Sequence, residues 1–179
     1  MGTRRRTRRI PADRHCPPAR RSRVPPGRPC EPFFCVWAGP WQGPDIGDPL
    51  PAFSAPTPDG SMVSTEAFGG QPRVLVFVSA GCGPCHALME ELAGARDLSG
   101  AVTVVTQRED LQALGVPKGV TVLLQDGREM EDLLGLVSSP FGITLTQAGI
   151  VADKRVPNTT DHLRELLSTA RQVHPLAKH

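Results

Sequence analysis

Residues 74–85 read VLVFVSAGCGPC, and this stretch decides the fold. Its first five residues are apolar and mostly β-branched, which is the pattern of a strand buried on both faces. Gly83 and Pro84 then open a helical pattern, because proline suits the first turn of a helix, where no amide hydrogen is needed. The stretch therefore predicts a buried strand that leads directly into a helix, with two cysteines at the junction.

Apolar runs and periodic segments continue along the chain after this junction. The helix that carries the cysteines has an apolar face, expected to be buried, formed by Cys85, Leu88, Met89 and Leu92. Further strands are expected at 101–106, 120–124, 141–146 and 150–156, the last two forming a hairpin around Gly149. Further helices are expected at 109–114, at 128–136 with Met130, Leu133 and Leu134 on the buried side, and from a cap at Thr159 or Thr160 to Val173. The order β-α-β-α-β-α-β-β-α predicts an α/β sandwich in which helices flank a central mixed sheet.

The two cysteines, Cys82 and Cys85, are placed for thiol chemistry. The amino end of a helix carries unpaired amides and a partial positive charge, which stabilise a thiolate. Cys82 would lie at the cap, facing solvent, whereas Cys85 would lie one turn inside and be shielded. We therefore expect Cys82 to attack a partner disulfide and Cys85 to resolve the mixed disulfide. His86 either assists as a neighbouring cation or is simply a solvated helix residue.

Two other chemistries use the same cysteines. Cys82, Cys85 and His86 match the attachment pattern of c-type haem, but a buried strand leads directly into the motif and Pro84 interrupts it, which is typical of redox pairs. Structural zinc would need a second pair, either Cys30 with Cys35 or His15 with Cys16, from a different part of the chain. No metal and no organic cofactor is therefore expected.

Residues 1–45 differ in composition from the rest of the chain. Residues 1–30 hold ten arginines and one acidic residue, whereas residues 46–179 hold ten basic and fifteen acidic residues. Proline and charge predict that this head is disordered. An alternative interpretation is that the head is an over-long gene start, translated from GC-rich upstream sequence. No apolar segment follows the arginines as an export signal requires, and no aromatic or glycine pattern indicates nucleic-acid binding. We expect a domain at 46–174 and a tail at 175–179.

The sequences IGDPLPAF at 46–53, PDG at 58–60 and GCGPC at 81–85 resemble the thioredoxin-like superfamily. More narrowly, residues 46–174 are similar to its redoxin branch, which includes the thiol–disulfide oxidoreductases of cytochrome c maturation and the methylamine-dehydrogenase maturation protein. The resemblance implies a thioredoxin-like fold and exchange of electrons with protein thiols and disulfides, supplied by a membrane-bound or soluble electron donor. It also implies a place on the extracytoplasmic side of the cell membrane, although no apolar run reaches the roughly 18–20 residues of a spanning helix.

The resemblance also implies a cis-proline opposite the redox pair. Pro140, in the sequence SSPFG at 138–142, would be that proline, and the backbone of Ser139 would pair with a substrate peptide. The alternative is an ordinary trans proline in a loop. The sequence departs from thioredoxin at two positions: Val76 stands where a buried aspartate is usual, and Gly81 replaces the tryptophan before the first cysteine.

Two alternative functions remain open at this point. A peroxiredoxin-like peroxidase has a serine or threonine three residues before its reactive cysteine, where Ser79 fits, and a proline seven residues before it, where Leu75 does not. A thioredoxin-like adaptor would use the same fold without catalysis. The redox pair favours an enzyme that acts through Cys82 and Cys85.

Overall fold

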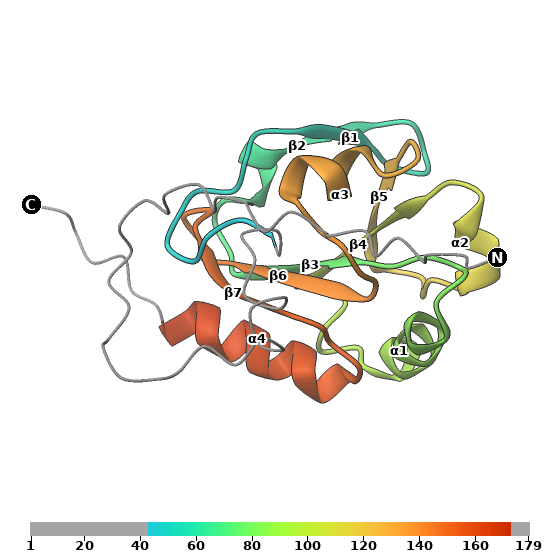
Figure 1. Cartoon of the computed structure of the whole chain (residues 1–179). Helices are drawn as coiled ribbons and strands as arrows, with labels where there is room; N and C mark the ends of the chain where they lie inside the picture. Colours follow the sequence, from blue (N-terminus) through green and yellow to red (C-terminus); the bar gives the residue numbers. More distant parts are fainter. Residues whose placement is uncertain (1–42, 173–179) are drawn as a thin grey trace, which may run out of the picture. The chain divides into compact units, whose positions relative to one another are not determined.

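A five-stranded sheet forms the centre of the part of the chain that the structure describes (Figure 1). The structure is a computed structural model and describes residues 43–172. The sheet has the strand order β5-β4-β3-β6-β7. Its strands are β3 (Arg73–Phe77), β4 (Val102–Gln107), β5 (Thr121–Gln125), β6 (Phe141–Leu145) and β7 (Val151–Arg155). Strands β3, β4 and β5 are parallel to one another. Strand β6 is antiparallel to β3, and β7 is antiparallel to β6, so the expected mixed sheet is confirmed.

Helices cover both faces of this sheet. Because successive side chains of β3 point to opposite sides of the sheet, they pack into two separate clusters. Val74, Val76 and Val78 form one buried cluster with leucines of α1 (Gly83–Gly94) and α4 (Thr160–Gln172). Leu75 and Phe77 form another with apolar residues of α3 (Glu129–Leu134). A short helix, α2 (Asp110–Leu114), connects β4 to β5. The strand read as buried on both faces is confirmed.

The structure adds a hairpin that the sequence did not predict. Strands β1 (Ser54–Pro56) and β2 (Met62–Ser64) pair in antiparallel fashion and lead into the 3-10 helix η1 (Thr65–Phe68). The turn between them contains Gly60 with a φ of +91°, and the Asp59 carboxylate accepts hydrogen bonds from Thr57 Oγ1 and the Ser61 amide. Strands of three residues are too short to show an alternating pattern.

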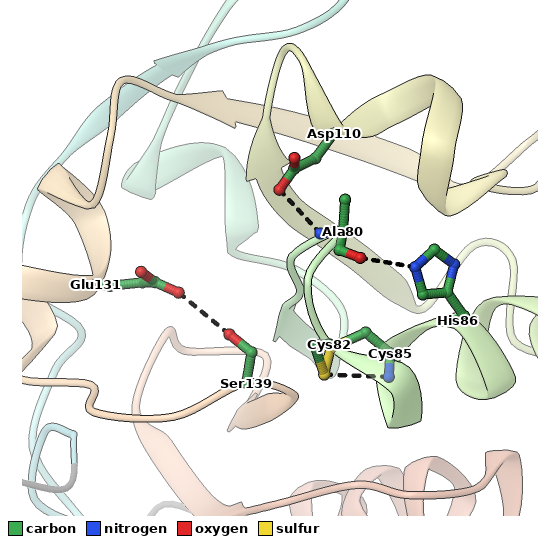
Figure 2. Close-up of a disulfide and its surroundings, with 7 residues drawn as sticks. All are labelled: Ala80, Cys82, Cys85, His86, Asp110, Glu131 and Ser139. Carbon is green, nitrogen blue, oxygen red and sulfur yellow. Dashed lines mark hydrogen bonds between the residues drawn. A yellow bond between two sulfur atoms is a disulfide. The ribbon is translucent and has the colours of Figure 1, made fainter.

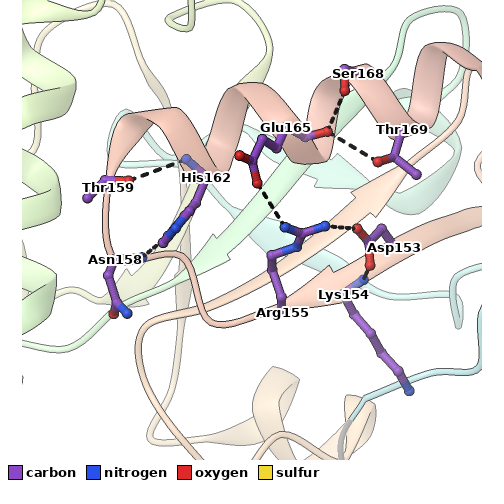
Figure 3. A network of polar contacts seen from close by, with 9 residues as sticks. All are labelled: Asp153, Lys154, Arg155, Asn158, Thr159, His162, Glu165, Ser168 and Thr169. Carbon is purple, nitrogen blue, oxygen red and sulfur yellow. Dashed lines mark hydrogen bonds and ion pairs between the residues drawn. The ribbon is translucent and has the colours of Figure 1, made fainter.

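The connection from β7 to α4 is polar, as Figure 3 shows. The guanidinium of Arg155 lies 2.6 Å from the Asp153 carboxylate and 3.1 Å from that of Glu165, which joins β7 to α4. The Thr159 hydroxyl accepts a hydrogen bond from the His162 amide at 3.4 Å. Thr159 is therefore the cap of the two candidates, and the helix begins at Thr160.

Helix α3 differs from its prediction. It is shorter than 128–136, and Leu133 is 53% exposed although we expected it to be buried. Met130 and Leu134 are buried as expected. The third buried residue of the helix is Glu131 instead of Leu133, with only 4% of its surface exposed. A helix of six residues makes less than two turns, so its apolar periodicity is a weak guide to its buried face.

Several sequence-based expectations concern residues outside the described range of 43–172. They include the disordered head, the C-terminal tail, the continuation of the last helix to Val173, and the zinc ligands drawn from Cys16, Cys30 and Cys35. The domain limits at 46–174 likewise stay a prediction. Within residues 43–172, none of the helices is both long and apolar enough to cross a membrane.

Candidate redox site

Cys82 and Cys85 form a disulfide, with their Cα atoms 5.2 Å apart. Cys82 is the cap residue of α1, and its Sγ accepts a hydrogen bond from the Cys85 amide at 3.2 Å. Cys85 is completely buried among the apolar residues beneath the helix, whereas Cys82 is partly exposed. Gly83 and Pro84 form the exposed first turn between them. Cys82 is therefore the cysteine of the pair that is in part open to solvent, and Cys85 is shielded one turn away.

The pairing of β3 with β6 brings a second predicted site segment to the same edge of the sheet. Phe77, the last residue of β3, lies opposite Phe141, the first residue of β6. Because the two strands are antiparallel, the segment after β3 and the segment before β6 leave the sheet side by side. Ser139 and Pro140 are therefore placed near the cysteines. The peptide bond between them is cis, which is the conformation that the resemblance implied.

Two side chains hold the backbone of Ala80, two residues before Cys82 (Figure 2). The Ala80 amide donates a hydrogen bond to Asp110 Oδ2 at 3.0 Å, and its carbonyl accepts one from His86 Nε2 at 2.8 Å. His86 is half-buried, and this contact ties its ring to the turn; a role as a neighbouring cation stays a prediction. Sequence reasoning missed Asp110. Its position after β4 was a usable signal, because the carboxyl ends of neighbouring parallel strands lie at one edge of a sheet.

Sequence reasoning also missed a buried carboxylate behind Ser139. Glu131 Oε1 accepts a hydrogen bond of 3.5 Å from the Ser139 hydroxyl, and Oε2 lies 3.2 Å from the guanidinium of Arg128 (Figure 2 draws the first contact). Arg128 also donates to the Leu136 carbonyl at 2.9 Å. Burial raises the pKa of Glu131, and the charge of Arg128 partly offsets this rise. These contacts tie α3 to the segment that carries Ser139.

Open space surrounds the two glycines that flank Cys82, although Cys82 itself packs partly against the apolar core. Cβ atoms built on Gly81 and Gly83 would meet no other atom within 4 Å. The backbone on either side of Cys82 is therefore not covered by other side chains at these two glycines. Among residues 43–172, no three His, Cys, Asp or Glu side chains come together as a set of metal ligands.

Comparisons with known proteins agree with this architecture. Residues 45–162 match the family model described as Redoxin. The chain is 28% identical over 142 residues to methylamine utilization protein MauD of Methylobacillus flagellatus, covering 74% of this chain and 67% of that protein. MauD of Methylophilus methylotrophus is 27% identical over 138 residues, with coverages of 74% and 65%. The chain thus spans about two thirds of the length of these relatives.

Solved structures give the same fold. The thio-disulfide isomerase of Thermus thermophilus superposes with a TM-score of 0.58 at 22% identity, covering 70% of this chain and 96% of that one. A candidate thiol:disulfide interchange protein DsbE from Chlorobium tepidum gives a TM-score of 0.58 at 24% identity, with coverages of 70% and 97%. The family model matches well over half of the residues, and the fold and the cysteine pair agree with it. The chain belongs to the Redoxin family, within the thioredoxin-like proteins.

Proposed function

We propose that this chain is a thiol–disulfide oxidoreductase that acts on protein thiols and disulfides, with Cys82 as its nucleophile and Cys85 as its resolving cysteine. The observation that carries the proposal is the disulfide at the amino end of α1. Its partly exposed cysteine is the cap residue, where the amides and dipole of the helix stabilise a thiolate. Its other sulfur is buried, so it reacts with the Cys82 sulfur and is shielded from outside thiols.

The proposed reaction proceeds through a mixed disulfide. The Cys82 thiolate attacks one sulfur of a partner disulfide, which forms the mixed disulfide and releases one partner thiolate that takes up a proton. Cys85 then loses its proton and attacks Cys82 Sγ, which releases the second partner thiolate. Two electrons have passed to the partner, and the Cys82–Cys85 disulfide seen in the structure is the product. The reverse sequence oxidises a partner dithiol.

Other site residues support these steps. Pro84 lies in the first turn of α1 and fixes the helix start there, and Gly83 leaves the approach to Cys82 open. Ser139 and Pro140, which precede β6, would pair with the backbone of the partner next to its disulfide. His86 acts on the turn through the Ala80 carbonyl.

The substrate is proposed to be a protein whose thiols or disulfides exchange with Cys82. A second partner, a membrane-bound or soluble electron donor, would supply electrons to the cysteine pair. The relatives are named for methylamine utilization, so a protein of that process is a candidate partner. The open surface beside Gly81 and Gly83 is consistent with a macromolecular partner.

Insulin reduction by dithiothreitol tests the proposal. The protein background should carry Cys16→Ser, Cys30→Ser and Cys35→Ser, so that only the redox pair contributes thiols. We expect this protein to accelerate the precipitation of insulin chains, and Cys82→Ser in the same background to be inactive. The matched variant Cys85→Ser should lose turnover as well but should accumulate mixed disulfides.

Equal activity of the parent and of Cys82→Ser would contradict the proposal. So would a Cys82–Cys85 disulfide that does not equilibrate with dithiothreitol or glutathione within minutes. That second result would favour the adaptor function, in which the fold binds partners without exchanging electrons.

A further inference from the structure

The turn before Cys82 is held at a single residue by two ionisable side chains from two different helices. The Ala80 amide is bound by Asp110 of α2 and the Ala80 carbonyl by His86 of α1 (Figure 2). Both polar groups of one backbone residue are thus satisfied by side chains rather than by the sheet. Neither contact is required by the exchange reaction itself, so both need a separate explanation.

The turn depends on such support because its own side chains provide little. Val78, directly after β3, makes the last hydrogen bond toward β4, from its amide to the Val105 carbonyl. Beyond it, Cys82 lies between Gly81 and Gly83, and glycine allows more backbone conformations than any other residue. A hydrogen bond from the Ala80 amide to a carboxylate is charge-assisted and therefore stronger than one to a neutral acceptor.

We propose that Asp110 is a positioning residue of the redox turn, which fixes Ala80 through its hydrogen bond and shifts the Cys82–Cys85 pair toward its disulfide form through its negative charge. The proposal rests on the proposed function and deepens it. It follows that Asp110 makes the pair a better electron donor.

The direction of this effect follows from charge. A thiolate on Cys82 is negative, whereas the disulfide is neutral, so a nearby carboxylate destabilises the reduced thiolate form relative to the disulfide. The titratable side chains drawn around the turn are Asp110 of α2, His86 of α1 and Glu131 of α3 (Figure 2). Of these, Asp110 and His86 bond directly to the backbone that leads into Cys82. Val76 leaves the usual position of the thioredoxin aspartate apolar, so Asp110 supplies a carboxylate from another direction.

Two substitutions separate the hydrogen bond from the charge. Asp110→Asn retains an oxygen that can accept from the Ala80 amide but removes the charge, whereas Asp110→Ala removes both. Glu109→Gln is the matched control, because Glu109 is the adjacent acidic residue at the start of the same helix and is exposed. All variants should be made in the full chain with Cys16, Cys30 and Cys35 replaced by serine.

The readouts are the equilibrium constant of the pair with glutathione and the pH profile of Cys82 alkylation by iodoacetamide. We expect Asp110→Asn to shift the equilibrium toward the dithiol by about threefold or more, equivalent to about 14 mV for a two-electron couple. The apparent pKa of Cys82 in the reduced protein should fall in parallel. Asp110→Ala should show the same shift and, in addition, slower insulin reduction. Glu109→Gln should match the parent protein.

An Asp110→Asn variant with the parent's equilibrium constant and alkylation profile would overturn the inference, as would a shift of equal size in Glu109→Gln. In either case a parent protein that exchanges with glutathione leaves the proposed function intact. A parent protein that does not exchange would instead contradict the proposed function, and the inference with it.

Discussion

Helices α1 and α3 both follow a strand of the parallel part of the sheet, yet polar contacts contribute differently to holding them. Helix α1 has twelve residues, is capped by the sulfur of its own Cys82, and buries an apolar face. Helix α3 has six residues, is capped by the side chain of Gln125 from β5, and buries the carboxylate of Glu131. The longer helix carries the reacting atoms, and the shorter one supports the segment that would receive the partner. Apolar packing thus holds the first, whereas polar contacts add to the apolar packing of the second.

The largest expected contrast between the two helices is in their leucines. Leu88 of α1 is completely buried, so Leu88→Ala should lower the free energy of unfolding by about 2–5 kcal/mol. Leu133 of α3 is 53% exposed, so Leu133→Ala should change it by no more than about 0.5 kcal/mol. Urea unfolding of both variants in the oxidised state measures the difference. Equal losses would show that α3 packs as the sequence first suggested.

The two caps provide the next contrast. Gln125 Oε1 accepts hydrogen bonds from the amides of Met130 and Glu131, at 3.2 and 3.3 Å. Gln125→Met keeps the length of this buried side chain but loses the acceptor, which should cost about 0.5–2 kcal/mol. Under reducing conditions, Cys82→Ser keeps an acceptor at the start of α1 and should cost less than Gln125→Met. The opposite ranking in urea unfolding would refute this account of the caps.

Replacement of Glu131 should affect a protein substrate and a small disulfide to different extents. The Glu131 carboxylate is paired with Arg128 and contacts Ser139, not the cysteine turn. Because Glu131→Gln loses this ion pair and loosens the support of Ser139, it should slow the reduction of insulin more than it slows exchange with glutathione. The cause is that a protein partner uses the Ser139 segment, whereas a small disulfide needs only Cys82. Steady-state rates with both substrates test this, and Asp132→Asn, an exposed acidic neighbour, is the control. A proportional loss with both substrates would contradict it.

The smallest expected effect is the pH dependence of stability. Burial raises the pKa of Glu131 above its ordinary value of 4.5, so the folded protein takes up this proton at a higher pH than the unfolded chain. The contribution of Glu131 to stability therefore increases as the pH falls from neutral toward 4.5, and it declines as the pH rises through the raised pKa. Glu131→Gln should lack this increment. The measurement is the free energy of unfolding in urea as a function of pH, for the parent and for Glu131→Gln. The difference between the two profiles cancels the contributions of other carboxylates, such as Asp97, whose pKa is lowered by its hydrogen bond to Arg164. A flat difference profile would refute the assignment.

The sequence predicted the parts of the site that depend on local pattern. The apolar run before the cysteines and Pro84 after them were sufficient to predict the strand, the helix and the exposed and buried positions of Cys82 and Cys85. The family resemblance, rather than any periodicity, pointed to Ser139 and Pro140.

The parts that failed depend on contacts between distant segments. Asp110 lies thirty positions from Ala80 along the chain, and Glu131 eight from Ser139. A carboxylate in a short helix is normally read as exposed, because buried acids are rare unless they are paired. Only the strand order, which places β3, β4 and β6 side by side, shows where these side chains meet the redox segment.

Trapping the mixed disulfide tests the central claim most directly. The variant Cys85→Ser, with Cys16, Cys30 and Cys35 also replaced by serine, retains Cys82 as its only thiol. Incubated with oxidised insulin and digested under non-reducing conditions, it should yield an insulin chain linked to the peptide that contains Cys82. The matched variant that keeps Cys85 and carries Cys82→Ser should yield no such adduct. Equal adducts on both cysteines, or none on Cys82, would contradict the account.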